Sequence, residues 1–190
     1  MQMSLGLTVT RSLRARNAVL VDAALVVLGS LLIAGMAQLR IYLPFTPVPI
    51  TGQTFAVLLI GAALGSRQGA AAVGLYLLQG AIGLPVFAGG GAGFAWLLGP
   101  TGGYLVGFLL AAFVVGRLAE RGCDRNLRSS LPAFLAGQMI IYACGVLWLS
   151  RFTGFDGALA AGLYPFLLGD LLKAGLAGAA LPAAWKFVRR

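Results

Sequence analysis

Six long runs of apolar residues, separated by short polar or cationic segments, make up most of this chain of 190 residues. The runs cover residues 20–39, 53–65, 69–84, 95–116, 131–150 and 165–186. A helix needs about 20 residues to cross a bilayer, where only helices and closed barrels satisfy all of their backbone hydrogen bonds. The runs lack the alternation of apolar and polar positions typical of barrel strands. The sequence therefore predicts an all-α integral membrane protein with a bundle of six transmembrane helices.

The composition agrees with a membrane location. Hydrophobic residues make up 59% of the chain and charged residues 10%, and the mean hydropathy is +0.92, which is far from the profile of a soluble domain. We expect one membrane domain over residues 1–190. Within it, residues 1–19 form a cytoplasmic tail, residues 20–186 form the six-helix bundle, and residues 187–190 form a cytoplasmic end.

The second and third runs are short, and only residues 65–69 separate them, so a re-entrant pair is an alternative to two crossings. The cations favour six crossings and a cytoplasmic N-terminus, because cytoplasmic loops carry an excess of Lys and Arg. Eleven of the fourteen cations then face the cytoplasm: Arg11, Arg14, Arg16, Arg67, Arg117, Arg121, Arg125, Arg128, Lys186, Arg189 and Arg190. Both termini are thus predicted to be cytoplasmic, in a multi-pass protein of the inner (plasma) membrane.

Several function classes lack their usual residues. The net charge of +9 does not indicate a nucleic-acid partner, because the cations flank apolar runs and form no basic module with interleaved aromatics. The chain has no histidine, no CxxC and no GxxxxGK[ST] motif, so we expect no catalytic site, no metal site and no bound cofactor. Cys123 and Cys144 are predicted to lie too far apart for a disulfide.

The last apolar run holds two ionisable residues, Asp170 and Lys173. They are three residues apart and therefore share one face of a helix. One interpretation is that they pair with each other and hold helices together. Ionisable residues inside membranes are rare, and they usually face cavities and mark a path for a substrate or ion. We therefore favour a ligand site in the outer half of the bundle.

Two segments predicted to lie outside the membrane point to the same half. Residues 40–53 contain three prolines, and residues 83–104 contain eight glycines. Both segments carry almost no charge, yet they contain Phe45, Phe87 and Trp96, which is typical of loops that fold over a small ligand. Flexibility alone is the alternative explanation for the glycines.

Three segments of the sequence resemble the BioY family. They read PFTPVPITGQTFAVLLIGAALG (44–65), GAIGLPVFAGGGAGFAWLLGPTGGYLVGF (80–108) and GDLLKAG (169–175). The resemblance implies a substrate-binding (S) component of an energy-coupling-factor (ECF) transporter, which captures biotin with high affinity on the outer face. It also implies partners, namely a transmembrane coupling (T) protein and two ABC-type ATPases that hydrolyse ATP. The chain itself would be no enzyme.

The chemistry of biotin suggests roles for the residues picked out above. Asp170 is expected to accept a hydrogen bond from a ureido N–H, and Lys173 to balance its charge and donate to the ligand. The other expected contacts belong to the loops and neighbouring helices: Phe45, Thr46, Gln53, Phe87, Gly89, Gly90, Gly91 and Tyr104. Packing or hydrogen bonding between helices remains an alternative role for Gln53 and Tyr104.

Members of such a class dock on the coupling protein through small residues of the first helix. The clearest pair here is Ser30 and Ala34, although ordinary packing inside the bundle is an alternative.

Two other function classes stay open at this level. One is a self-sufficient ion-coupled carrier of biotin or another small water-soluble vitamin, with Asp170 as its proton relay. The other is an intramembrane enzyme, which the absence of a second deep carboxylate and of histidine disfavours.

Overall fold

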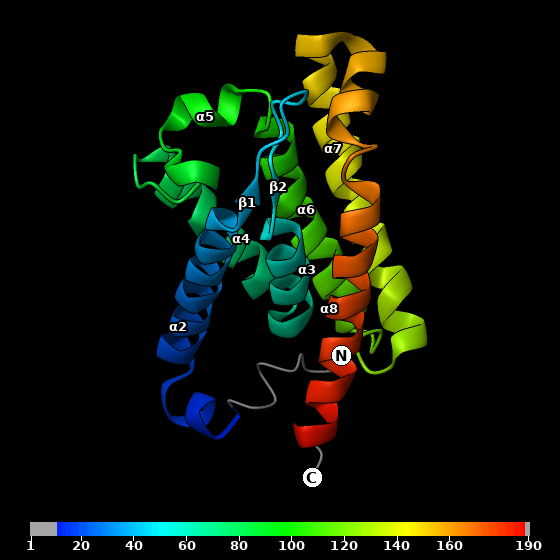
Figure 1. The fold of residues 1–190 in the computed structure, drawn as a ribbon. Helices are drawn as coiled ribbons and strands as arrows, with labels where there is room; N and C mark the ends of the chain where they lie inside the picture. The colour runs from blue at the N-terminus through cyan, green and yellow to red at the C-terminus, as the bar shows by residue number, and fades with distance from the viewer. Residues whose placement is uncertain (1–10, 189–190) are drawn as a thin grey trace.

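The computed structural model describes residues 11–188, and the side chains of residues 18–186. Its six long helices form a bundle (Figure 1). They are α2 (Arg11–Gln38), α3 (Gln53–Leu64), α4 (Ser66–Ala81), α6 (Gly102–Ala119), α7 (Leu127–Gly162) and α8 (Leu167–Val188). Each predicted apolar run overlaps one of them, so the count of six is confirmed. Of the expected N-terminal tail, residues 11–19 are helical and residues 1–10 lie outside the described residues.

Among residues 18–186, three stretches are long and apolar enough to cross a membrane: Ala18–Gln38, Gly102–Ala119, and Leu127–Lys186, which covers α7 and most of α8. Helices α3 and α4 have 12 and 16 residues, so they extend only about 18 and 24 Å, against about 30 Å for the hydrocarbon core. Eight of the twelve residues of α3 are buried, so neighbouring helices cover much of its surface.

One predicted run is divided in the structure. The run 95–116 comprises α5 (Phe94–Leu98) and the longer α6, with residues 99–101 between them. Pro100 has no backbone N–H for a helical hydrogen bond, and the residue before a proline is pushed towards an extended conformation. Gly99 accordingly has φ −73° and ψ −179°, and the expectation of a single helix there was wrong.

Glycines bring α3, α4 and α6 into backbone contact. Gly65, the only residue between α3 and α4, has φ 87°, a conformation that side chains disfavour. A Cβ atom on Gly69 would lie 2.7 Å from the Cα atom of Gly61, and a Cβ on Gly61 would lie 2.7 Å from the carbonyl oxygen of Ala112. Such close approach of small residues is the usual way in which helices pack in lipid.

A carboxylate secures the turn between α3 and α4. Glu120, just after α6, accepts hydrogen bonds from the backbone N–H and the hydroxyl of Ser66, both at 2.8 Å, and pairs with Arg117 at 3.1 Å. An anion at the first residue of α4 also interacts favourably with the helix dipole. Burial raises the pKa of Glu120, but the hydrogen bonds from Ser66 and the charge of Arg117 outweigh it and lower that pKa below its usual value.

The other end of the bundle carries a hairpin and a folded loop. Strands β1 (Arg40–Ile41) and β2 (Ile50–Thr51) pair antiparallel, with Arg40 opposite Thr51. The loop after α4 contains the 3₁₀ turn η1 (Ala88–Gly90) and α5. Gln38 ties this loop to α2, because its Nε2 donates to the carbonyl oxygen of Phe87 at 3.1 Å.

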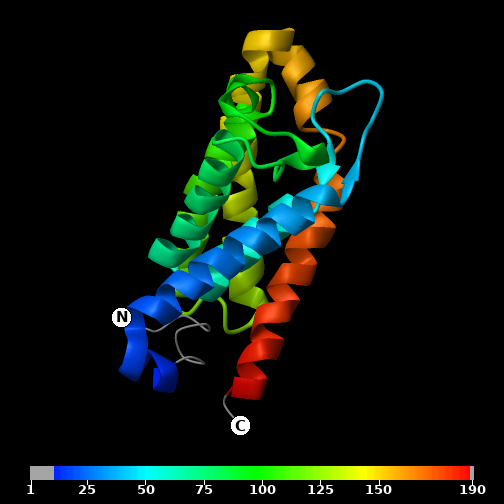
Figure 2. The ribbon, with the colours of Figure 1, turned by 90° about the vertical axis from the view of Figure 1, so that its left-hand side faces the viewer.

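The two halves of the bundle therefore differ in structure. The beginning of α2 and the end of α8 lie at one end, whereas the hairpin and α5 lie in the opposite half (Figures 1 and 2). Helix α7 breaks at Gly154, with φ 72°, and its last part folds back towards α8.

We expect Gly69→Ala to destabilise the protein, because the added Cβ would contact the backbone of α3. Backbone atoms cannot move aside as a flexible side chain can. Overpacking of this kind typically costs about 1–3 kcal/mol. The matched control is Gly74→Ala on the same helix, whose Cβ meets only Leu109 at 3.9 Å. The control should leave stability unchanged or raise it by up to about 1 kcal/mol. Thermal melting of the detergent-purified protein measures both, and equal melting temperatures would contradict the described α3–α4 contact.

We expect the stabilising effect of the Glu120 charge to depend on pH. Because the pKa of Glu120 is lowered in the folded state, its contribution is present above the unfolded Glu pKa of about 4.3 and is lost as the pH falls through the folded pKa. Glu120→Gln should therefore melt below the wild type at pH 7, and the difference should shrink in acid. Asp156→Asn, at an exposed position, serves as control. A difference that is constant with pH would contradict the assigned role.

Candidate ligand site

A buried ion pair lies near the beginning of α8. The carboxylate of Asp170 is 4% exposed, and its Oδ1 lies 2.7 Å from Nζ of Lys173. The two residues share one helical face, as their spacing predicted. Isolated charges are very costly to bury, so the surrounding groups must compensate both of them.

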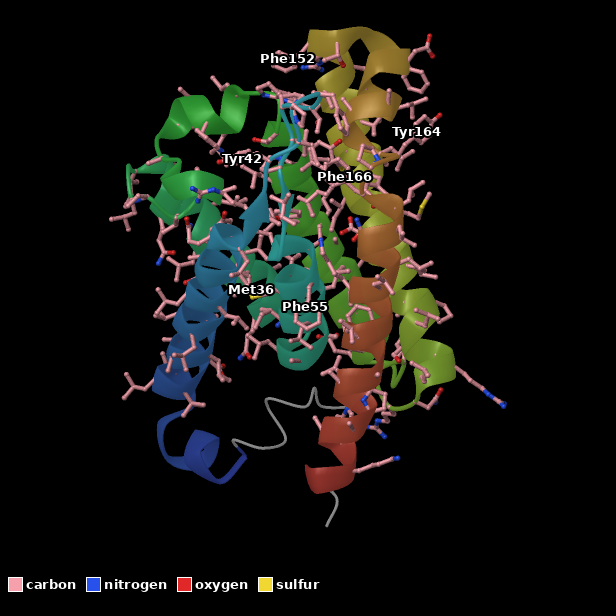
Figure 3. The ribbon with its side chains drawn as sticks, in the orientation of Figure 1. Met36, Tyr42, Phe55, Phe152, Tyr164 and Phe166 are labelled. Carbon is pink, nitrogen blue, oxygen red and sulfur yellow. The ribbon has the colours of Figure 1, made fainter. Side chains whose placement is uncertain are left out.

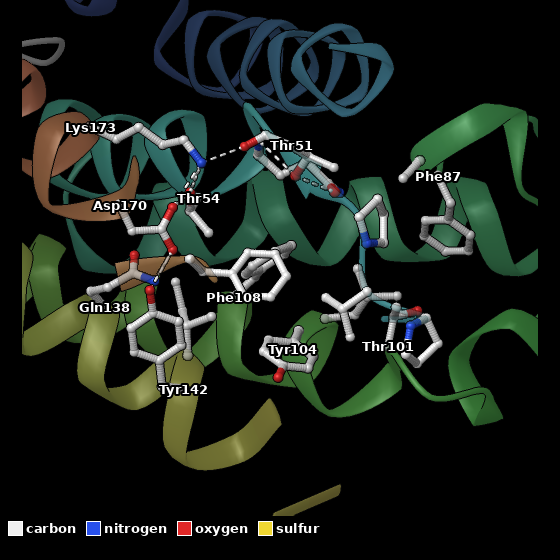
Figure 4. Close-up of a pocket in the computed structure, with 18 of the residues that line it drawn as sticks. Thr51, Thr54, Phe87, Thr101, Tyr104, Phe108, Gln138, Tyr142, Asp170 and Lys173 are labelled. Carbon is white, nitrogen blue, oxygen red and sulfur yellow. Dashed lines mark hydrogen bonds and ion pairs between the residues drawn. The ribbon is translucent and has the colours of Figure 1, made fainter. Parts of the chain in front are cut away.

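Three further side chains donate to the Asp170 carboxylate. Thr54 of α3 donates its hydroxyl to Oδ1 at 3.1 Å. Gln138 and Tyr142 of α7 donate to Oδ2 at 2.7 and 2.8 Å. Each carboxylate oxygen thus receives two hydrogen bonds, and α3, α7 and α8 meet at this group (Figure 4).

The ammonium of Lys173 is equally well compensated. Besides Asp170, Nζ donates to the carbonyl oxygen of Thr51 at 2.7 Å and to the hydroxyl of Thr54 at 3.4 Å. Thr51 belongs to β2, so this bond joins α8 to the hairpin. The pair is therefore neutral overall and connects four elements of the fold.

A cavity opens beside the ion pair. Its lining combines aromatic and apolar side chains with a few polar ones, and comes from the hairpin, the loop after α4, and helices α3, α6, α7 and α8. The lining residues are Tyr42, Pro47, Val48, Pro49, Thr51, Gln53, Thr54, Phe87, Ala88, Trp96, Thr101, Tyr104, Leu105, Phe108, Gln138, Ile141, Tyr142, Phe166, Asp170 and Lys173.

The cavity has two different ends. The ion pair, Gln138 and Tyr142 lie at one end, and Tyr104 and Phe108 lie between them and Thr101 (Figure 4). Thr101, Trp96 and Tyr42 line the part formed by the loops. Tyr42, just after β1, and Phe166, just before α8, both lie in the half of the bundle that carries the hairpin (Figure 3). A mostly apolar cavity with a few convergent polar groups is typical of small-molecule sites.

The structure brings half of the predicted site residues to this cavity: Asp170, Lys173, Gln53, Phe87 and Tyr104. Gln53 and Tyr104 are also hydrogen-bonded within the protein. Gln53 donates to the Tyr76 hydroxyl at 2.6 Å and accepts from Thr51, while Tyr104 donates to the carbonyl oxygen of Gly162 at 2.7 Å. Both residues therefore combine the packing role and the lining role that their positions suggested.

The remaining predicted residues do not line the cavity. Phe45 is 66% exposed at the hairpin tip. Thr46 donates to the carbonyl oxygen of Ala161 at 2.6 Å and so fastens the hairpin to the end of α7. A Cβ on Gly89 would collide with the Tyr42 hydroxyl, and one on Gly91 would lie 2.7 Å from the Trp96 ring.

Gly90 has φ 74°, and a Cβ atom added to it would meet no other atom within 4 Å. Gly89 and Gly91 thus let the loop pass closely beneath the aromatic side chains, Gly90 allows its turn, and it is Tyr42 and Trp96 that line the cavity. The expectation that these glycines touch the ligand directly finds no support in their position.

Sequence reasoning missed Thr54, Gln138 and Tyr142. The last two are four residues apart, which places them on one helical face, and they are polar within an apolar run. That spacing was a usable signal, although the sequence does not say which helix their face meets.

On the first helix, α2, the structure does not expose the pair expected to dock on a coupling protein, Ser30 and Ala34. Ser30 is fully buried, and its hydroxyl donates to the carbonyl oxygen of Val27 at 2.8 Å. Ala34 packs against the core cluster. Small residues at this point let α4 approach, since a Cβ on Gly29 would lie 2.9 Å from the Cβ of Ala72. The Ser30/Ala34 face is therefore internal packing, the alternative considered above. The exposed face of α2 comprises Ala23, Ala24, Val27, Leu28, Leu31, Leu32 and Gly35.

Comparisons with known proteins give the family. The sequence profile of the BioY family matches residues 8–190. A probable biotin transporter BioY from Pyrococcus horikoshii is 44% identical over 131 residues, which span 69% of this chain and 76% of the relative. The biotin transporter BioY of Rhizobium etli is 39% identical over 165 residues, spanning 82% of this chain and 88% of the relative.

A solved structure agrees with the sequence relatives. The crystal structure of the S-component for biotin from an ECF-type ABC transporter superposes with a TM-score of 0.81 at 30% sequence identity. The match covers 90% of this chain and 93% of the other. The chain therefore belongs to the BioY family, as its three sequence motifs predicted.

Proposed function

We propose that this chain binds biotin as the substrate-binding (S) component of an ECF-type vitamin uptake transporter. The observation that carries the proposal is the cavity with the ion pair of Asp170 and Lys173 at one end. The names of the relatives and of the matching crystal structure supply the ligand. The family is one of transporter components, so the chain is not an enzyme.

The two ends of the cavity suit the two ends of biotin. The ureido ring offers two N–H donors and a carbonyl, and it fits the polar end, where Asp170, Gln138 and Tyr142 meet. The thioether ring and the aliphatic chain are apolar and fit between Tyr104 and Phe108. The carboxylate then lies towards the loops, where the Thr101 hydroxyl and the Trp96 indole N–H make no hydrogen bond to residues 18–186 and remain available as donors.

Transport needs partners, because the sequence contains no GxxxxGK[ST] motif for ATP. A transmembrane coupling protein and two ABC-type ATPases supply the energy in this proposal. The docking surface is the exposed face of α2, which presents the small residues Ala24 and Gly35 together with Leu28 and Leu31 to its surroundings. Small residues allow a partner helix to approach closely in lipid.

The proposed orientation places both termini in the cytoplasm and the cavity towards the outside of the plasma membrane. Arg67, Arg117 and Arg121 lie with the Ser66–Glu120 contact at the end of the bundle opposite the hairpin, whereas Arg40 and Arg151 lie at the hairpin end. A cytoplasmic excess of cations is the rule for membrane proteins.

Calorimetry of the detergent-purified chain against a panel of water-soluble vitamins tests the ligand. Biotin should bind tightly at a ratio of one to one, and the other vitamins should produce no binding heat. Ala24→Trp on the exposed face of α2 should leave this binding unchanged, because its side chain points away from the cavity. Tight binding of another vitamin, with none of biotin, would overturn the proposed function.

Labelling of single cysteines in intact cells tests the orientation, in a background with Cys123→Ser and Cys144→Ser. Arg67→Cys and Phe155→Cys both introduce a thiol at an exposed position, at opposite ends of the bundle. A membrane-impermeant maleimide should label Phe155→Cys and spare Arg67→Cys, whereas a permeant one should label both. The reverse pattern would mean that the cavity faces the cytoplasm.

A further inference from the structure

The Asp170 carboxylate has no unused acceptor position. An ionised carboxylate offers about four lone-pair sites. Asp170 receives two donors on each oxygen: Lys173 and Thr54 on Oδ1, and Gln138 and Tyr142 on Oδ2. The three N–H donors of Lys173 are likewise directed at Asp170, Thr51 and Thr54. A ligand N–H reaches this carboxylate only by displacing one of its donors.

Two of those donors retain acceptors of their own. The Tyr142 hydroxyl oxygen has two lone pairs, and the Gln138 amide beside it engages no more than one of them, while Oε1 of Gln138 accepts no hydrogen bond from residues 18–186. Both side chains line the cavity and point towards Asp170 at its polar end (Figure 4). Their unused lone pairs lie beside the ion pair, and a ligand can reach them without breaking the network.

The ion pair fixes the direction of these hydrogen bonds. A hydroxyl can either donate or accept, but an ionised carboxylate only accepts. Tyr142 must therefore use its O–H group to donate a hydrogen bond to Asp170. Towards the cavity, its oxygen offers only lone pairs. By the same reasoning, the Gln138 amide must direct one of its N–H groups at Asp170. A hydrogen bond to a charged group is also stronger than a neutral one, which holds Tyr142 in this orientation.

From this geometry we infer that Tyr142 is a specificity-determining residue, which accepts a hydrogen bond from a ureido N–H of the ligand, with Gln138 beside it. Asp170 is then a positioning residue, which fixes the donor direction of both. The inference rests on the proposed function, and it replaces the direct contact between Asp170 and the ureido N–H that the sequence suggested. The chemical signature that the site reads is an N–H donor in a compact cyclic ligand.

The first test is Tyr142→Phe, which keeps the ring and removes the oxygen. If Tyr142 accepts the ligand N–H, biotin affinity falls by about tenfold or more, because the ligand donor is left unpaired. If Asp170 is the direct contact, the substitution frees a lone pair on Oδ2, and affinity stays the same or rises. The second outcome overturns the inference.

A pair of ligand analogues separates hydrogen bonding from a general disturbance of the site. Each is a cyclic carbamate in which a ring oxygen replaces one ureido N–H of biotin. The wild type should bind at least one of them about tenfold more weakly than biotin. In Tyr142→Phe, the affinities for biotin and for the same analogue should differ by no more than about threefold. A merely structural role for Tyr142 would weaken biotin and analogue equally, and an unchanged ratio therefore overturns the inference.

The matched control is Tyr164→Phe, which removes the same atom from an exposed ring outside the cavity (Figure 3). Affinity and analogue ratio should both equal those of the wild type. If Tyr142→Phe does not fold, 3,5-difluorotyrosine at position 142 keeps the bond to Asp170 but makes the oxygen a poorer acceptor. Biotin should then bind more weakly, and unchanged affinity overturns the inference. Failure of the wild type to bind biotin would instead remove the proposed function itself.

Discussion

The buried pair of Asp170 and Lys173 is the interaction on which the rest of this structure depends. A charge inside a membrane bundle is tolerated only when other protein groups replace its water. The pair obtains those groups from α3, α7 and the hairpin, so these elements must meet at the same point. Removing one partner would leave the other charge with neutral hydrogen-bond partners only, which is more costly than losing an ordinary hydrogen bond. The same contacts that stabilise the pair therefore position the polar end of the cavity.

The short helix α3 makes room for the cavity. It begins at Gln53, two residues after the end of β2, so the chain passes from the hairpin into the bundle within the half that carries the hairpin. Proline and aromatic residues of the hairpin, and the folded loop after α4, cover the space that a longer helix would fill. The opposite end is closed by backbone contacts between glycines and by Glu120. The fold thus combines one tightly packed end with one end that can hold a ligand.

The sequence predicted the features that follow from local chemistry. Long apolar runs marked the six helices, and two charges in one run marked the site. The division at Pro100 was also readable from local rules but was overlooked. Contacts between distant segments were less accessible. Tyr142 and Gln138 form a polar face on an otherwise apolar helix. Only the tertiary packing shows that this face meets Asp170. Ser30 looked like a docking residue, yet the approach of α4 buries it.

The geometry of the ion pair also bears on how uptake is driven. A proton relay must exchange protons with water during each cycle, but Asp170 is 4% exposed and accepts four hydrogen bonds, one of them from an ammonium at 2.7 Å. Protonation would turn an acceptor into a donor facing other donors and would leave Lys173 without its counter-ion. A group held in this way suits a site whose polarity stays constant while ligand enters and leaves. In the proposed function, the energy for uptake accordingly comes from partner ATPases and not from a proton carried by Asp170.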